Sequence, residues 1–237
     1  MSSRVLNASI QRIPNSELKI RTTHTIPTNI LPLSVDLRPR MRPVQDHGSL
    51  GGSAHAIVSA YQFAYPTTTP SALFVYYNSK GANTLGNALK CVQAKGFCAE
   101  SDWPYDVANV NVQPGEHCYT SSQLRGCKVE NICQDLNSML NALHDGIPFL
   151  ANIATFPAFV NTIVAKTGKI PLPARDAKPI GGHTILVCGY DCRIQQWICQ
   201  NSWGKDWGEK GYCYLPFLYL LDSSLCSDVW CLSKTDE

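Results

Sequence analysis

Two polar side chains in the last third of the chain have types that could handle a proton. His183 follows two glycines, and Asn201 lies 18 residues further on. An imidazole accepts or donates a proton near neutral pH, and a side-chain amide can hold the ring in one orientation. A third candidate, Ser53, follows a glycine-rich turn, where a hydroxyl attacks a carbonyl only if a base activates it. These residue types predict a site for nucleophilic catalysis.

The residues around these candidates resemble those of papain-like cysteine peptidases, in the compact cathepsin-like branch of microbes and large DNA viruses. After Asn201 the sequence reads Ser-Trp-Gly-Lys-Asp-Trp-Gly-Glu-Lys-Gly-Tyr, and this double Trp-Gly motif rarely occurs by chance. His183 and Asn201 lie 130 and 148 residues after Ser53, within the separation of about 130 to 150 residues that is typical of the family. The resemblance runs from Val35 to Leu232 and includes segments 71–78, 96–106 and 166–168.

The resemblance implies a role for each of these residues. Such a peptidase keeps a cysteine thiolate at the N-terminus of a buried helix, where the helix dipole and an imidazolium hold the thiol pKa at about 3 to 4. His183 would hold that charge and protonate the leaving amine, Asn201 would orient the ring, and Trp203 would shield their hydrogen bond from water. His47 replaces a glutamine that donates to the oxyanion, and a neutral imidazole can also donate one hydrogen bond.

No cysteine occupies the nucleophile position. The family motif Gln-Gly-x-x-Gly-Ser-Cys reads His-Gly-Ser-Leu-Gly-Gly-Ser over residues 47–53. Aligned on the glycine turn, Ser53 takes the nucleophile position; aligned on the following helix, Gly52 takes it, as if one residue had been deleted. Because a hydroxyl does not ionise near neutral pH even at a helix N-terminus, neither register supplies the stored ion pair.

These departures favour a papain-like homologue that has lost peptidase activity and keeps a polypeptide-binding cleft. His47, Gly52 and Ala54 all differ from the family pattern, whereas a laboratory knock-out would change the cysteine alone. Three alternatives remain. The chain could be a proteolytic enzyme acting through Ser53, His183 and Asn201, an active peptidase disabled by a Cys-to-Ser change, or a serine-bearing enzyme with non-proteolytic chemistry.

Composition argues against several other classes of function. The chain of 237 residues is 44% hydrophobic and carries a formal charge of +2, without a basic block that could neutralise a run of phosphates. We therefore expect no nucleic-acid partner.

The sequence has no run of 18 apolar residues and no long apolar stretch near its start, which predicts a soluble protein with no membrane partner and no signal peptide. An intracellular or virion-associated location is expected.

Eleven cysteines form an odd set, so at least one cannot pair within the chain. Without a secretory signal, most are expected to be buried free thiols, with oxidation in a special compartment such as a virion as the alternative. No Cys-x-x-Cys pair is present, so neither a metal nor any other cofactor is expected.

The predicted fold class is α+β, with helices first and a mostly antiparallel sheet or barrel second. We expect an extended arm over residues 1–34 and a papain-like domain over 35–237, with a helical lobe over about 35–128, a β lobe over about 129–232 and a cleft between them. The arm could lie in this cleft as a propeptide would. Helices are predicted at 54–64, 72–80, 85–95 and 135–144, and strands at 149–153, 184–190, 196–200 and 211–215.

Overall fold

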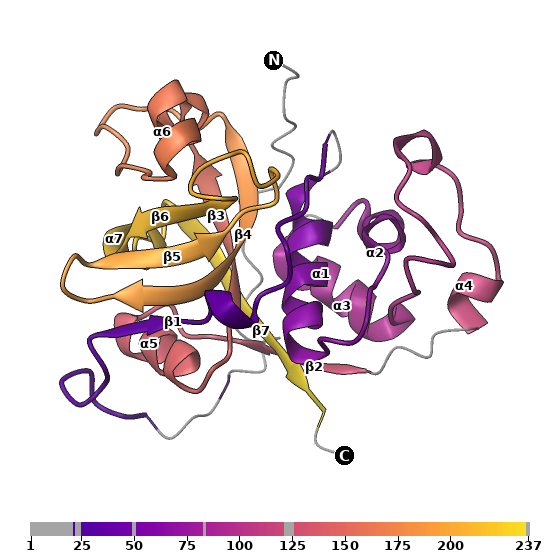
Figure 1. The fold of residues 1–237 in the computed structure, drawn as a ribbon, viewed down its shortest axis with the longest axis horizontal. Helices are drawn as coiled ribbons and strands as arrows, with labels where there is room; N and C mark the ends of the chain where they lie inside the picture. Colours follow the sequence, from indigo (N-terminus) through magenta and orange to yellow (C-terminus); the bar gives the residue numbers. More distant parts are fainter. Residues whose placement is uncertain (1–20, 22–24, 49–50, 83, 121–125, 236–237) are drawn as a thin grey trace.

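Helix α1 (Gly52–Ala64) lies between a group of helices and a large sheet in the computed structural model (Figure 1). The structure describes residues 21, 25–48, 51–82, 84–120 and 126–235. In Figure 1, α2, α3 and α4 stand on one side of α1 and most of the sheet stands on the other. The predicted α+β fold with two lobes is confirmed.

The helical lobe is built from α1, α2 (Ala72–Ser79) and α3 (Leu85–Lys95), with the short α4 (His117–Thr120) beyond them. Ser71 and Thr84 each accept a hydrogen bond from the backbone N–H three residues on, and so cap α2 and α3. Gly96 ends α3 with a positive φ of 74°. The three predicted helices of this lobe are therefore confirmed, with starts and ends within two residues.

The other lobe is a seven-stranded sheet in which every pair of neighbouring strands is antiparallel. Along the sheet the strand order is β2-β7-β3-β4-β5-β6, and β1 pairs with β4. The strands are β1 (Ser34–Asp36), β2 (Cys127–Asn131), β3 (Phe149–Thr155), β4 (Gly181–Asp191), β5 (Gln196–Gln200), β6 (Tyr212–Pro216) and β7 (Cys226–Lys234).

Among the described residues, further short helices and 3₁₀ turns complete the fold. The predicted helix at 135–144 is α5 (Leu136–His144), and its N-cap Asp135 accepts a hydrogen bond from the Ser138 backbone N–H. The remaining elements are α6 (Thr162–Thr167), α7 (Phe217–Leu221) and the 3₁₀ turns η2 (Arg38–Arg40), η3 (Val107–Asn109) and η4 (Pro157–Val160).

Three strands were not predicted, and one of them changes the expected lobe boundary. β1 at residues 34–36 pairs with β4, so the domain begins in the β lobe and enters the helical lobe afterwards. β2 and β7 pair with each other at one end of the sheet. Their short or mixed polar sequences carry a weak strand signal, because partner strands far away in the sequence decide whether such segments pair.

The structure describes residues 21 and 25–33 of the predicted arm, and they pack against the β lobe. The Ile26 backbone exchanges hydrogen bonds with the Asn141 side chain on α5, and the Tyr190 hydroxyl donates to the Pro32 carbonyl at 3.0 Å. Leu31 is buried in the core of this lobe. For these residues the expectation of an arm lying in the cleft is wrong; residues 1–20 and 22–24 lie outside the described residues.

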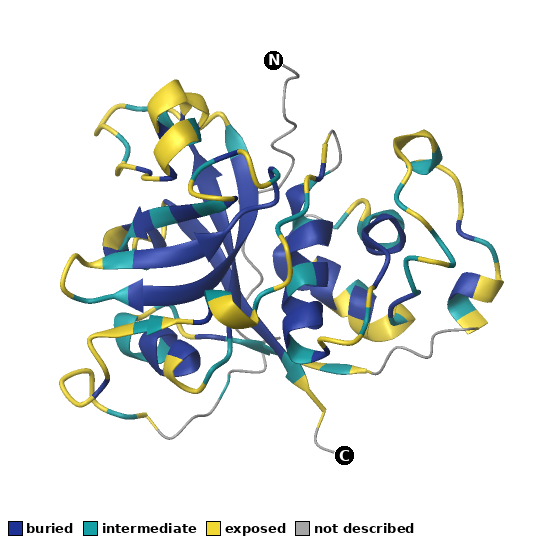
Figure 2. Ribbon diagram, in the orientation of Figure 1, coloured by how far each residue is buried: buried dark blue, intermediate teal, exposed yellow. Residues whose placement is uncertain are grey.

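α1 packs directly on the sheet, which brings the two lobes together. The core of the helical lobe includes Ile57 of α1 together with Leu150, Leu186 and Trp230 from strands β3, β4 and β7. In Figure 2, most of α1 and the central strands are dark blue, the colour of buried residues. The N-terminus of α1 is therefore held at a set position relative to β4 and β5. None of the helices in the described residues is long and apolar enough to span a bilayer.

The contact between β1 and β4 depends on Gly189. A Cβ atom at this residue would lie 2.4 Å from the Val35 carbonyl oxygen and 3.1 Å from Ile198 Cδ1. We therefore predict that Gly189→Ala lowers the free energy of unfolding by about 1–3 kcal/mol, measured by urea denaturation. The control is Gly126→Ala, whose Cβ would meet no atom closer than 4.0 Å and should change stability by less than about 0.5 kcal/mol.

Candidate active site

His183 and Asn201 lie together because β4 and β5 are antiparallel neighbours. His183 is on β4, and Asn201 comes directly after β5. His183 Nε2 lies 2.8 Å from Asn201 Oδ1, which also accepts the Ser202 backbone N–H at 2.8 Å. Because this oxygen accepts both bonds, the Nε2 atom carries a proton and Nδ1 is the atom of the ring that faces α1. Both side chains are buried, at 1% and 4% exposure.

Trp203 covers the His183 ring and also reaches His47. The rings of Trp203 and His183 have centroids 5.0 Å apart, and Trp207 stands edge-on to Trp203 at 4.9 Å. Trp203 is 2% exposed. The two tryptophans of the double Trp-Gly motif therefore exclude water from the bond between His183 and Asn201, which strengthens that bond.

His47 is held in one tautomer by Trp203. The indole Nε1 donates to His47 Nε2 at 2.9 Å. An indole N–H only donates, so the His47 ring is neutral with its proton on Nδ1. The His47 backbone is fixed as well, because its N–H donates to the Ser202 carbonyl at 3.0 Å and its carbonyl accepts from the Tyr105 hydroxyl at 2.5 Å. His47 and His183 line the same space, with ring centroids 6.0 Å apart.

Gly52, and not Ser53, is the residue of α1 that faces His183. A Cβ atom on Gly52 would lie 2.7 Å from His183 Cε1, 2.8 Å from His183 Nδ1 and 3.5 Å from Ser202 Oγ. Ser53 points elsewhere, and its hydroxyl is paired with the Thr184 hydroxyl at 2.8 Å. The predicted pairing of Ser53 with His183 is therefore corrected: the geometry fits the second register, in which the chain is one residue shorter before α1.

The N-terminus of α1 has no side-chain partner of its own. Its N-cap is Gly51, which offers no side-chain hydrogen bond, and the first turn contains no acidic residue. The positive end of this 13-residue helix therefore points at the His183 ring, with no acidic residue in the first turn of the helix. This arrangement would stabilise a negative charge at residue 52, but glycine has no side chain to carry one.

His55 is a buried group that the sequence analysis missed. It lies on α1 one turn beyond Gly52, packs edge-on against the Tyr105 ring at 5.2 Å and is 6.1 Å from the His47 ring. Burial and, to a smaller extent, the neighbouring His47 lower the pKa of His55 to about 3, while Asp46 opposes the shift. His55 lies three residues after Gly52, so helical spacing could have placed it on the same face of α1. The sequence alone does not indicate that its ring is buried.

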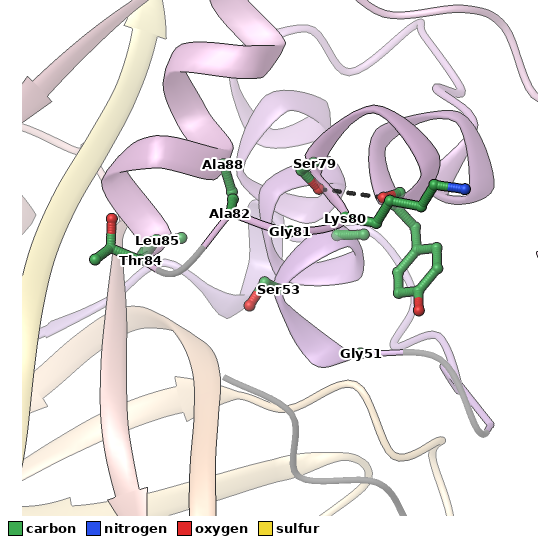
Figure 3. Close-up of a pocket in the computed structure, with 11 residues that line it drawn as sticks. Gly51, Ser53, Ser79, Lys80, Gly81, Ala82, Thr84, Leu85 and Ala88 are labelled. Atoms are coloured by element: carbon green, nitrogen blue, oxygen red, sulfur yellow. Dashed lines mark hydrogen bonds between the residues drawn. The ribbon is translucent and has the colours of Figure 1, made fainter. Parts of the chain in front are cut away.

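A cavity of about 320 Å³ opens beside the N-terminus of α1, between α2 and α3 (Figure 3). Gly51 and Ser53 lie on one side of it and Gly81 and Ala82 on the other. Its lining combines small side chains with hydroxyl groups: Gly51, Ser53, Ala54, Tyr76, Ser79, Lys80, Gly81, Ala82, Thr84, Leu85 and Ala88. A cavity of this size and mixed polarity can hold one amino-acid side chain.

Across the ranges that the structure describes, no group of three or more His, Cys, Asp or Glu residues could hold a metal ion.

The comparisons with known proteins identify the family of this chain. Residues 76–217 match the model of the papain family of cysteine proteases, a span that includes His183 and Asn201 and begins after α1. The chain is 30% identical over 218 residues to an uncharacterized peptidase C1-like protein of Acanthamoeba polyphaga mimivirus, covering 81% of this chain and 70% of that protein. The chain belongs to the papain family.

Other relatives are more distant. Cathepsin K of Gallus gallus is 25% identical over 230 residues, which cover 86% of this chain and 65% of that protein. Among solved structures, xylellain, a cysteine protease from Xylella fastidiosa, superposes with a TM-score of 0.90 at 26% identity, over 100% of this chain and 98% of that one. The digestive procathepsin L 3 of Tenebrio molitor, at 22% identity and a TM-score of 0.65, shows the fold alone.

The close approach of His183 to Gly52 leads to a stability prediction. Gly52→Ala places a Cβ against a buried ring that Asn201 and Trp203 hold in place, so we expect the free energy of unfolding to fall by about 1–3 kcal/mol. Gly51→Ala is the matched control, because its Cβ would meet only the Tyr76 ring at 3.7 Å, an ordinary contact. Urea denaturation of the two variants measures the difference, and equal stabilities would contradict the observed packing.

A second prediction concerns acid sensitivity. The folded pKa of His55 lies below its usual value of 6.5, so the unfolded chain takes up a proton that the folded chain excludes. Stability should therefore fall as pH drops below about 6.5. Between pH 7 and 5 the protein should lose about 2 kcal/mol more unfolding free energy than the His55→Phe variant. Urea denaturation at both pH values tests this, and identical losses in the two proteins would refute it.

Proposed function

We propose that this protein is a papain-family homologue that binds polypeptide in the groove between its lobes without hydrolysing it. One observation carries the proposal: the His183 ring lies where the side chain of residue 52 would begin, 2.7 Å from its Cβ position. In a peptidase of this family that side chain would carry the nucleophile. Here the space is filled by the imidazole, so there is neither a thiol nor room for one.

Neither Ser53 nor the first cysteine of the chain takes over the nucleophile role. The Ser53 hydroxyl is bonded to Thr184, which leaves it without a contact to the base. The first cysteine of the chain, Cys91, lies on α3. Loss of the nucleophile of a peptidase costs roughly 10⁶ in turnover. The bond between His183 and Asn201 therefore has a structural role in this protein, and peptide-bond cleavage is lost.

Several features around the candidate site support peptide binding. The two lobes, the His47 side chain and the cavity beside Ser53 are all present. Relatives in this family carry the names of peptidases, whose ligands are polypeptides. A protein that keeps the groove and lacks the nucleophile can hold an extended chain without cutting it. Specificity then depends on side chains that enter the cavity next to α1.

The first test is hydrolysis of a panel of fluorogenic peptides. We expect turnover at background level, at least roughly 10⁴-fold below that of an active papain-family enzyme, and no labelling by thiol-directed epoxides at residue 52 or 53. His183→Ala serves as the contamination control and should leave the background unchanged. Hydrolysis that disappears in His183→Ala would refute the proposal and revive the serine-peptidase alternative.

The second test is binding of fluorescein-labelled casein peptides, followed by fluorescence anisotropy. Ala82→Trp fills the cavity beside α1 and should weaken binding at least about tenfold, since the lost pocket contacts are typically worth more than 1 kcal/mol. Ala174→Trp is the control, because Ala174 lines a separate cavity in the β lobe and should leave affinity within about twofold. Absence of binding, or equal effects of the two variants, would count against the groove.

A further inference from the structure

Two buried cysteines meet in a small cluster of the helical lobe. Cys98 follows α3 and Cys118 belongs to α4, and their exposures are 1% and 0%. Their side chains lie close enough to interact. They share an apolar cluster with the buried Phe74, against which Trp103 and Tyr119 also pack. The two thiols are therefore neighbours in space although 19 residues separate them in the sequence.

Both thiols face the same turn. Cys98 Sγ lies 3.2 Å from the Ala99 carbonyl oxygen, and Cys118 Sγ lies 3.8 Å from the Asp102 carbonyl oxygen. The Asp102 and Trp103 backbone N–H groups both donate to the Ala99 carbonyl, which closes this turn. Both sulfur atoms therefore lie against carbonyl groups of one compact turn, close enough to react with each other.

A histidine stands next to one of the thiols. His117 Nε2 is 3.4 Å from Cys118 Sγ and 3.3 Å from the Asp102 carbonyl oxygen. The neutral ring can accept the thiol proton, and the resulting imidazolium can donate to the Asp102 carbonyl. Burial raises the pKa of the Cys98 thiol, and the neighbouring Cys118 adds to the shift. Cys118 therefore has a neighbouring base, His117, whereas Cys98 remains a protonated thiol.

We propose that Cys98 and Cys118 form an oxidation site that a peroxide converts into a disulfide, with His117 as the proton acceptor. His117 takes the Cys118 proton, and the thiolate attacks a peroxide oxygen, breaks the O–O bond and forms a sulfenic acid. The leaving hydroxide takes the proton from His117 and becomes water. The Cys98 thiol then attacks the sulfenic sulfur, which releases a second water and closes the disulfide. Two thiols are oxidised and one peroxide is reduced to two waters.

Oxidation would close a loop that supports the groove. Residues between the two cysteines include Tyr105, whose hydroxyl bonds the His47 carbonyl and whose backbone N–H bonds the Glu100 side chain. A Cys98–Cys118 bond would fix both ends of this loop and restrict its unfolded states. The inference does not depend on the proposed function, because it concerns a cluster outside the groove.

The chain contains its own control pair. Cys199 on β5 and Cys213 on β6 face each other across the sheet and share a side-chain hydrogen bond. Both are fully buried, and burial raises the pKa of Cys199. The groups that shift this pKa are Cys213 and Cys188, and no imidazole is among them. This pair has a similar thiol contact without an adjacent base, so it should stay reduced.

The experiment treats the full-length reduced protein with equimolar hydrogen peroxide, traps free thiols with iodoacetamide and maps disulfides by mass spectrometry. We expect a Cys98–Cys118 disulfide as the main product, with Cys199 and Cys213 alkylated after unfolding. Oxidation should raise the midpoint of thermal unfolding by roughly 5–10 °C, and this rise should be absent in Cys98→Ala.

The rate separates chemistry from mere proximity. His117→Gln should slow disulfide formation roughly 10- to 100-fold without changing the product, whereas His144→Gln, an exposed histidine at the end of α5, should leave the rate unchanged. The proposal is overturned if Cys98 and Cys118 stay reduced while other thiols react, or if His117→Gln reacts as fast as the parent protein. Peptide binding is measured separately, so failure here leaves the groove hypothesis standing.

Discussion

The contact between the His183 ring and the backbone of Gly52 is the constraint on which the candidate site depends. A residue with any side chain at position 52 would collide with a buried ring. That ring cannot easily move, because Asn201 bonds one edge and Trp203 covers one face. A papain-like site normally places a charged sulfur between helix and imidazole. Here the glycine backbone and the His183 ring meet directly, with a Cβ position on Gly52 only 2.7 Å from the ring.

This contact is a product of the join between the two lobes. Helix α1 packs against β3, β4 and β7 through a shared apolar core, so its N-terminus cannot drift away from β4. The β4–β5 pairing sets Asn201 beside His183, and Trp203 then links His183 to His47. The structure thus brings together His183, Asn201, Trp203 and His47. The front half has changed, and the family match begins only at residue 76.

Polar groups of the helical lobe also surround the candidate site. His55 introduces a buried imidazole behind the site, which makes the folded state sensitive to acid. Tyr105 reaches from the loop 98–118 to the His47 carbonyl, and the two cysteines at the ends of that loop lie in one apolar cluster. The same loop therefore connects His47 with the thiol pair.

The sequence by itself determined the family, the α+β order of elements and the identity of His183, Asn201, Trp203 and His47, because these depend on motifs and on local periodicity. Most predicted helices and strands follow from caps, glycines and apolar spacing. Only the tertiary structure decided that Gly52, and not Ser53, faces the base, and that β1 and residues 25–33 pack on the β lobe. A shift of one residue before a helix rotates each side chain by about 100°, and no pattern along the chain records which register packs against a strand more than 100 residues away.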